Sequence, residues 1–265
     1  MRKIPAIVFT DLDGTLLDHH SYSYAAAVPA LTLLKKHQIP VIMASSKTAA
    51  EIAPLRQELG LAAYPAIVEN GAGLLPAQAN AQTTDRPEYQ KIRDILQSLP
   101  QEIVQYYKGF GDMSNVEVST STGLSPAQSA LAKTRAFSEP GLWKGPDEIL
   151  DVFLLALSDK GITARQGGRY LTLSFGKTKA DQMASLCELY GNPPVIALGD
   201  APNDVEMLLA ADHPVLICNP DSKPLPGLSS DQKARITHST LPGPQGWNEA
   251  IMQIVPTLTC PEQGT

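Results

Sequence analysis

Cysteines are few in this 265-residue sequence, and it has no run of basic residues. The three cysteines, Cys187, Cys218 and Cys260, are odd in number and widely spaced, so they match neither a disulfide framework nor a zinc site. They favour a reducing, cytoplasmic location. A formal net charge of −6 without a basic run argues against a nucleic-acid partner or an anionic membrane surface.

Long hydrophobic stretches are also missing. No segment approaches the roughly 20 apolar residues of a membrane-spanning helix, and the apolar run before Asp11 is too short for a signal peptide. A hydrophobic content of 43% is nevertheless enough for one large core or two modest ones in a chain of this length. We therefore expect no membrane partner. We also expect the protein to be a monomer or a homodimer.

Two aspartates follow the first apolar run. Residues 7–16 read Ile-Val-Phe-Thr-Asp-Leu-Asp-Gly-Thr-Leu, so Asp11 and Asp13 leave a predicted strand on the same side, where their charges repel each other. Mg²⁺ prefers carboxylate and phosphate oxygens, and an aspartate can itself form an aspartyl-phosphate. The pattern indicates phosphoryl transfer, although Asp13 and Thr15 also fit the cap of a following helix.

A second apolar run, residues 194–198, is likewise followed by acidic residues, in the segment Gly-Asp200-Ala-Pro-Asn203-Asp204. If the two strands are neighbours in a parallel sheet, Asp200 lies beside the first two aspartates. Asn203 and Asp204 would then orient the ligands of an ion. Taken alone, this segment fits a turn and a capped helix equally well.

Two weaker patterns fit the same site. Residues 39–44 run into Ser45 and Ser46, where hydroxyls and N–H groups at the start of a helix can bind an anion. Lys177 precedes a helical stretch, where its ammonium could neutralise the carboxylates and a phosphate. Taken singly, the serines are ordinary helix caps and the lysine is an ordinary surface charge.

Together and in this order, the four patterns resemble the four motifs of the haloacid dehalogenase superfamily of aspartate-nucleophile phosphatases. The resemblance implies a Mg²⁺-dependent phosphomonoesterase that works through an aspartyl-phosphate. It implies Asp11 as the nucleophile and Asp13 as the general acid and base. The implied phosphate ligands are Ser45 and Lys177, and the implied metal site consists of Asp11, Asp13, Asp200 and Asp204, supported by Asn203.

Further motifs resemble those of the mannosyl-3-phosphoglycerate phosphatases and their bacterial relatives. They are Glu69-Asn70-Gly71-Ala72, Gly111-Asp112-Met113-Ser114, Thr122-Gly123-Leu124-Ser125, Gly167-Gly168-Arg169-Tyr170 and Gly243-Pro244-Gln245-Gly246-Trp247. This resemblance implies a glycosyl-3-phosphoglycerate as the substrate. The implied contacts to its carboxylate and hydroxyls are Ser46, Lys47, Glu69, Asn70, Gly71, Glu139 and Arg169.

Two positions depart from this narrower pattern. Ala136 stands where relatives often have glutamate, and Thr172 stands where they often have histidine. These departures leave the sugar, mannosyl or glucosyl, open. A broad sugar-phosphate phosphatase of the same superfamily, a phosphosugar mutase and a phosphate-binding module without activity remain alternatives.

Apolar runs alternate with helical patterns, which predicts an α/β fold with a Rossmann-like, doubly wound parallel sheet. The expected strands are 5–10, 40–44, 66–69, 194–198 and 214–218, and the expected helices are 25–37, 48–59, 178–190 and 204–211. The tail from residue 256 reads as a loop.

A different pattern covers residues 84–172. It predicts helices near 88–99, 126–135 and 146–159, a strand at 115–119, and a hairpin of 162–165 with 169–173. We therefore expect a catalytic core of residues 1–83 and 173–265 and an inserted α+β cap of residues 84–172, which resembles the C2 caps of the superfamily.

Overall fold

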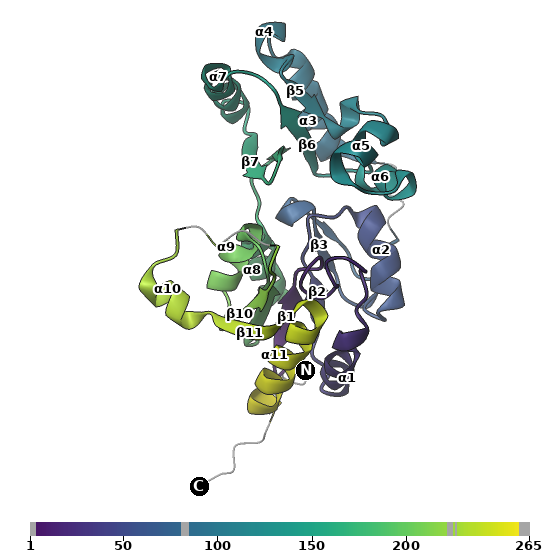
Figure 1. Cartoon of the computed structure of the whole chain (residues 1–265), viewed down its shortest axis with the longest axis vertical. Helices are drawn as coiled ribbons and strands as arrows, with labels where there is room; N and C mark the ends of the chain where they lie inside the picture. Colours follow the sequence, from purple (N-terminus) through teal and green to yellow (C-terminus); the bar gives the residue numbers. More distant parts are fainter. Residues whose placement is uncertain (1–3, 81–84, 222–224, 226, 260–265) are drawn as a thin grey trace. The chain divides into compact units, whose positions relative to one another are not determined.

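The computed structural model describes residues 4–80, 85–221, 225 and 227–259 (Figure 1). The chain divides into two compact units. The first consists of residues 1–45, 63–67 and 179–265, and the second of residues 46–62 and 68–178. The division into a core of 1–83 with 173–265 and a cap of 84–172 stays a prediction.

A five-stranded, fully parallel sheet forms the centre of the first unit, in the order β11-β10-β9-β1-β2. The strands are β1 (Ile7–Thr10), β2 (Val41–Met43), β9 (Val195–Gly199), β10 (His213–Cys218) and β11 (Thr237–Pro242). Thr10 of β1 is in register with Met43 and with Leu198. The residues that follow β1, β2 and β9 therefore reach one edge of the sheet, where such folds bind ligands.

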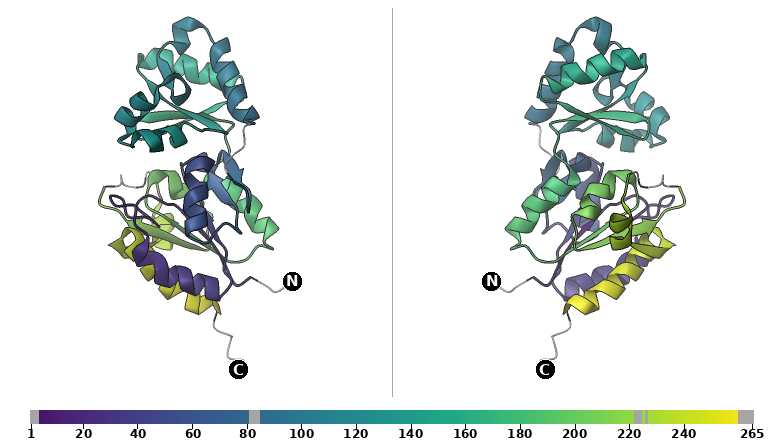
Figure 2. Two further views of the ribbon diagram at one scale, coloured as in Figure 1. Left: turned by 90° about the vertical axis from the view of Figure 1, so that its right-hand side faces the viewer. Right: turned by 90° about the vertical axis from the view of Figure 1, so that its left-hand side faces the viewer.

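Helices cover both faces of this sheet (Figure 2). Helix α1 (Val28–Lys36) packs against α11 (Gly243–Thr259), which also packs against β10 and β11. Helix α9 (Val205–Leu209) packs against β9, β10 and α8 (Lys179–Leu189). Every residue of β1, β2 and β9 is buried, as expected for a parallel sheet between helical layers. The predicted doubly wound α/β core is confirmed.

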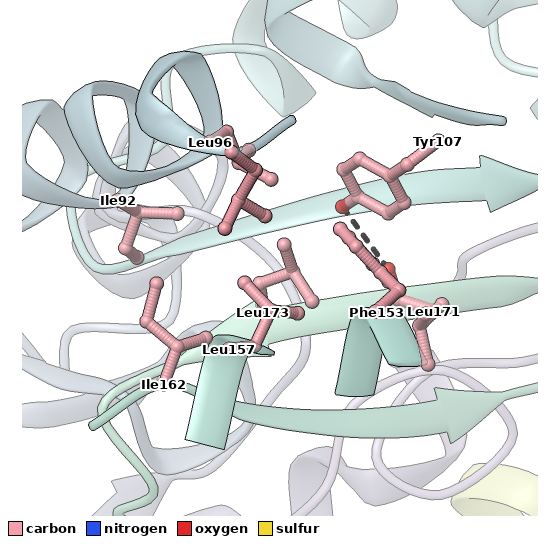
Figure 3. Packing of buried hydrophobic residues seen from close by; sticks show 9 residues of the cluster. Ile92, Leu96, Tyr107, Phe153, Leu157, Ile162, Leu171 and Leu173 are labelled. Carbon is pink, nitrogen blue, oxygen red and sulfur yellow. Dashed lines mark hydrogen bonds between the residues drawn. The ribbon is translucent and has the colours of Figure 1, made fainter. Parts of the chain in front are cut away.

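The second unit contains a four-stranded antiparallel sheet in the order β5-β6-β8-β7. The strands are β5 (Tyr107–Gly109), β6 (Ser138–Trp143), β7 (Thr163–Gly167) and β8 (Tyr170–Ser174). One face carries α3 (Pro87–Ser98) and α7 (Asp147–Ser158), whose apolar side chains meet the strands in Figure 3. Within this core, Tyr107 Oη lies 2.6 Å from the Glu139 carbonyl and 3.2 Å from the Leu171 carbonyl, the second contact being drawn in Figure 3, so the buried hydroxyl is paired.

The remaining elements are short. In the first unit they are η1 (Ala25–Ala27), η4 (Pro202–Asp204) and α10 (Ser230–Arg235). In the second they are α2 (Ala49–Glu58), η2 (Glu69–Gly71), β4 (Gly73–Leu75), α4 (Gln101–Val104), η3 (Phe110–Asp112), α5 (Asn115–Thr122) and α6 (Pro126–Ala132). Strand β3 (Ala66–Val68) pairs with β4, and Ile67 forms a parallel bridge with Ala44 beyond the end of β2.

Two sequence predictions of local structure were wrong. The predicted strand at 115–119 is the start of α5, because Ser114 and Glu117 form a capping box. Ser114 Oγ accepts a hydrogen bond from the Glu117 N–H at 3.2 Å, and the Glu117 carboxylate accepts one from the Ser114 N–H at 2.7 Å. Residues 256–259 continue α11 and are not a loop.

Helices in the described part of the chain are all too short or too polar to cross a membrane. Cys187 is buried and Cys218 is exposed, and both are free thiols. Cys260 lies outside the described residues.

Candidate active site

Three buried aspartates meet at the edge of the parallel sheet where β1 and β9 end. Asp11 follows β1, Asp200 follows β9, and Asp204 ends η4. They are 7%, 6% and 0% exposed, and one oxygen of each lies within 4.8 Å of the others. Hard oxygen donors gathered in this way suit Mg²⁺, which takes carboxylates and phosphate oxygens as ligands. Among the described residues, these three form a group that can hold a metal ion.

The cation that faces this acidic cluster is Lys179, the first residue of α8. Its Nζ donates to Asp11 Oδ1 at 2.7 Å and to Asp204 Oδ1 at 2.7 Å, and the residue is only 2% exposed. The sequence analysis chose Lys177, which is exposed. Its assignment as a phosphate ligand stays a prediction, and the lysine that contacts the acids lies two positions later, because a Lys-x-Lys pair before a helix does not reveal which lysine turns into the core.

The Asp200 carboxylate is held on both of its oxygens. Thr15 Oγ1 donates to Asp200 Oδ1 at 2.9 Å, and Asn219 Nδ2 donates to Asp200 Oδ2 at 2.6 Å. Asn219 directly follows β10, the neighbour of β9 in the sheet. The sequence analysis did not select it. Its place at the end of an apolar run was the one available signal.

Asp204 accepts hydrogen bonds both from Lys179 and from the turn after β9. While one of its oxygens receives the Lys179 ammonium, Oδ2 accepts the backbone N–H groups of Asp200 and Ala201, each at 3.1 Å. Asn203, in the same short helix, is exposed. Its predicted supporting role stays a prediction.

Charge dominates this site, since three buried carboxylates face one ammonium. Burial raises the pKa of Asp11 well above its ordinary value, the Lys179 ammonium opposes this rise, and Asp204 and Asp200 add to it. Burial also raises the pKa of Asp200. Burial alone would lower the pKa of Lys179, but Asp11 and Asp204 more than offset it, so the lysine stays charged. A further positive charge would restore the ionised form of Asp11, and the residues therefore fit a divalent cation.

Asp13 and Ser45 lie at the same edge as the acidic cluster by their place in the chain. Asp13 is partly exposed, and the group of three acids is formed without its side chain. Ser45 follows β2, is 2% exposed and donates its N–H to the Ile67 carbonyl at 3.0 Å. The assignments of Asp13 as acid and base and of Ser45 as a phosphate ligand stay predictions.

Behind Asp11, a tryptophan of α11 supports the end of β1. Trp247 is fully buried, and its Nε1 donates to Thr10 Oγ1 at 2.9 Å. Thr10 Oγ1 in turn donates to the Asp11 carbonyl at 2.8 Å. The backbone at Asp11 is thus held in place by α11.

Glu69, predicted to contact substrate, is buried in the second unit. Its carboxylate accepts the N–H groups of Ala136 and Phe137 at 2.8 and 3.1 Å and the Ser138 hydroxyl at 2.7 Å. The Arg135 Nε lies 3.3 Å from the same carboxylate. The Glu69 carboxylate thus accepts three hydrogen bonds and pairs with Arg135, which gives it a supporting position, and a contact with sugar stays a prediction.

The other predicted substrate residues of the second unit occupy varied environments. Glu139 is fully buried and accepts from Arg93 Nη1 and from the Gly111 N–H, each at 2.8 Å. Burial raises its pKa. Arg169 is exposed and donates from Nη1 to the Ser121 carbonyl at 2.6 Å. Of the rest, Ser46 is exposed, Lys47 and Asn70 are half-buried and Gly71 is buried.

Residues 8–119 match the family described as haloacid dehalogenase-like hydrolase. Among solved structures, the chain is similar to a Thermoplasma acidophilum protein at 18% identity, covering 96% of this chain and 97% of that one with a TM-score of 0.64. A haloacid dehalogenase superfamily phosphatase from Bacteroides thetaiotaomicron is similar at 16% identity, 96% and 94% coverage and a TM-score of 0.64. A sugar phosphatase of subclass IIB is similar at 15% identity, 94% and 99% coverage and a TM-score of 0.62. These likenesses extend over almost the whole of each chain and show a shared fold, an α/β core with a cap domain.

Proposed function

We propose that this chain, a haloacid dehalogenase-like hydrolase over residues 8–119, is a Mg²⁺-dependent phosphomonoesterase that forms an aspartyl-phosphate on Asp11. The observation that carries the proposal is the 2.7 Å contact of buried Asp11 with Lys179 inside the acidic cluster. Burying this many charges is costly unless further groups compensate them. A divalent cation and a phosphate ester would complete the balance of charge.

The residues divide the chemistry between them. An Asp11 carboxylate oxygen attacks the phosphorus, and the bond from phosphorus to the leaving alkoxide breaks. Asp13 gives its proton to that alkoxide and later takes one from the water that hydrolyses the aspartyl-phosphate. Lys179 replaces Lys177 in this scheme. Its ammonium favours the ionised form of Asp11 and, with Ser45, offers donors to the phosphate oxygens.

The side chains of Asp11, Asp200 and Asp204 and the backbone carbonyl of Asp13 would hold Mg²⁺. When bound, the ion supplies positive charge to the phosphate oxygens. A phosphate-binding module without activity fits less well, because binding alone does not need an acid such as Asp13 two residues after the nucleophile.

For the substrate, we propose a glycosyl-3-phosphoglycerate, either mannosyl or glucosyl, that is recognised by a cap domain of residues 84–172. The motifs around Glu69, Gly111, Gly123 and Arg169 support this choice, because they resemble those of phosphatases for that substrate class. A broad specificity for sugar phosphates is the second candidate, favoured by the likeness to a structure described as a sugar phosphatase. A mutase would have to shield the aspartyl-phosphate from water. The cytoplasmic location and a monomeric or homodimeric state stay predictions.

Hydrolysis of p-nitrophenyl phosphate and of a panel of phosphorylated sugars and glycosyl-3-phosphoglycerates, with Mg²⁺, tests the proposal. Asp11→Asn should lower kcat by more than about a thousandfold, which corresponds to ~4 kcal/mol of barrier. Asp231→Asn, the same substitution at an exposed aspartate of α10, is the matched control and should leave kcat unchanged. Activity of Asp11→Asn within about tenfold of the parent would remove Asp11 as the nucleophile.

A further inference from the structure

Asn219 takes no part in the chemistry proposed above, yet its side chain reaches into the acidic cluster. Its Nδ2 donates to Asp200 Oδ2 at 2.6 Å, while Thr15 donates to the other oxygen of the same carboxylate at 2.9 Å. With a donor on each oxygen, the carboxylate plane of Asp200 cannot turn without breaking a hydrogen bond. The orientation of a proposed metal ligand is thus fixed from two sides.

The turn after β1 leaves room for this contact. A Cβ at Gly14 would lie 2.7 Å from Asn219 Nδ2 and 2.9 Å from Asp200 Oδ2, closer than side chains tolerate. Gly14 also has a φ of +80°, which glycine adopts without strain. The glycine of the Asp-x-Asp-Gly turn therefore leaves room for the pair of Asp200 and Asn219, which follow the ends of β9 and β10 at the same edge of the sheet.

We propose that Asn219 is a positioning residue whose amide, with Thr15, fixes the Asp200 carboxylate in the orientation that makes the site prefer Mg²⁺ over Ca²⁺. The inference rests on the proposed function, because it assumes that Asp200 holds a divalent cation. Mg²⁺ demands a near-ideal octahedral arrangement of ligands, whereas Ca²⁺ accepts variable numbers and angles of oxygens. A carboxylate held from both sides suits the first ion, and a carboxylate free to rotate suits the second.

A purely structural role would use the other end of the same amide. Asn219 Oδ1 accepts the Asp221 N–H at 3.0 Å and so closes the turn after β10. The oxygen serves the turn and the nitrogen serves Asp200, so substitutions can separate the two functions. Asn219→Ser keeps an oxygen that can accept from the turn and loses the amide donor, whereas Asn219→Ala loses both.

Isothermal titration of the metal-free protein with Mg²⁺ and with Ca²⁺ tests the inference without any substrate. Loss of a group that orients a metal ligand typically costs about 10- to 100-fold in metal affinity. We expect Asn219→Ala and Asn219→Ser both to raise the Kd for Mg²⁺ by about tenfold or more, and that for Ca²⁺ by less than about threefold. Asn248→Ala is the matched control, because Asn248 accepts a hydrogen bond from the Ala30 N–H, a contact that involves none of the clustered acids.

The outcomes separate the inference from the proposed function. If Asn219→Ala and Asn219→Ser bind Mg²⁺ within about twofold of the parent, or if both ions weaken equally, the positioning role is overturned while the phosphatase assignment stands. If Asn219→Ser alone binds normally, the turn and not the donor matters, and the inference fails. If the parent binds no Mg²⁺ and hydrolyses no phosphate ester, the positioning role and the proposed function are both refuted.

Discussion

Replacing Lys179 by methionine removes the only ammonium that the structure places against the acidic cluster in the described part of the chain. Methionine keeps most of the length of the lysine side chain, so the change tests charge more than packing. It leaves Asp11 and Asp204 without a donor that lies 2.7 Å from each of them. Breaking a buried ion pair from one side typically costs about 3–5 kcal/mol, because the remaining charge stays buried. We expect a loss of this size near neutral pH in EDTA.

The loss should depend on pH, with a sign that follows from Asp11. Its pKa in the native state lies above the ordinary value of 3.8, so between the two values the native state binds more protons than the unfolded chain. Stability therefore falls as the pH rises through that window. The Lys179 charge lowers the pKa of Asp11 in the native state. Its removal therefore raises this pKa further and widens the pH range in which the native state binds more protons. The variant should recover part of its stability at about pH 5 relative to about pH 7.5.

Urea unfolding followed by tryptophan fluorescence, at both pH values and with or without Mg²⁺, provides the measurement. Lys177→Met is the matched control. It is the same substitution two residues earlier, at an exposed lysine, and should change stability by less than about 0.5 kcal/mol. A loss below about 1 kcal/mol for Lys179→Met, or one that is equal at the two pH values, would refute the account of the cluster as a charge-compensated site.

Three further outcomes are expected. Ca²⁺ should inhibit hydrolysis where Mg²⁺ activates it, because the larger ion recruits extra oxygens and can engage both oxygens of Asp11; equal kcat with both ions contradicts this. Arg169→Ala should raise KM for a glycosyl-3-phosphoglycerate about ten- to a hundredfold but not KM for p-nitrophenyl phosphate, and an equal effect on both would deny the guanidinium a role toward the glycerate carboxylate. Trp247→Phe should lower the free energy of unfolding by about 1–3 kcal/mol, since it leaves the buried Thr10 hydroxyl without its donor; an unchanged urea midpoint would contradict the contact.

The parallel core could be predicted because short apolar runs in the local sequence indicate its central strands. Apolar runs that end in Asp11 and Asp200 imply neighbouring strands, and neither needs distant information to be recognised. Strand β11, in contrast, is polar and almost wholly exposed at the edge of the sheet, so it lacks the apolar signal that marks a strand. Its pairing with β10 depends on the tertiary structure and cannot be predicted from residues 237–242 alone.

The site shows the same division between local and non-local information. The acids follow from motif spacing, but the choice of lysine depends on which way the first turn of α8 faces, and Asn219 depends on β10 lying beside β9. Glu69 is a second example. Its motif predicts a contact with sugar, but the motif does not express that the carboxylate accepts three hydrogen bonds from residues 136–138 and pairs with Arg135, in a segment far away in the sequence.

The hydrogen bond from Trp247 to Thr10 spans 237 positions of the chain, and that from Lys179 to Asp11 spans 168. During synthesis, which proceeds from the N-terminus at about 5–20 residues per second, Asp11 therefore leaves the ribosome well before Lys179 and Trp247. Strand β1 has to wait for β9 as its second neighbour. A nascent chain that stops before residue 247 carries Asp11 without the hydrogen bond from Trp247 to Thr10, so the surroundings of Asp11 are complete only after residue 247 has been synthesised.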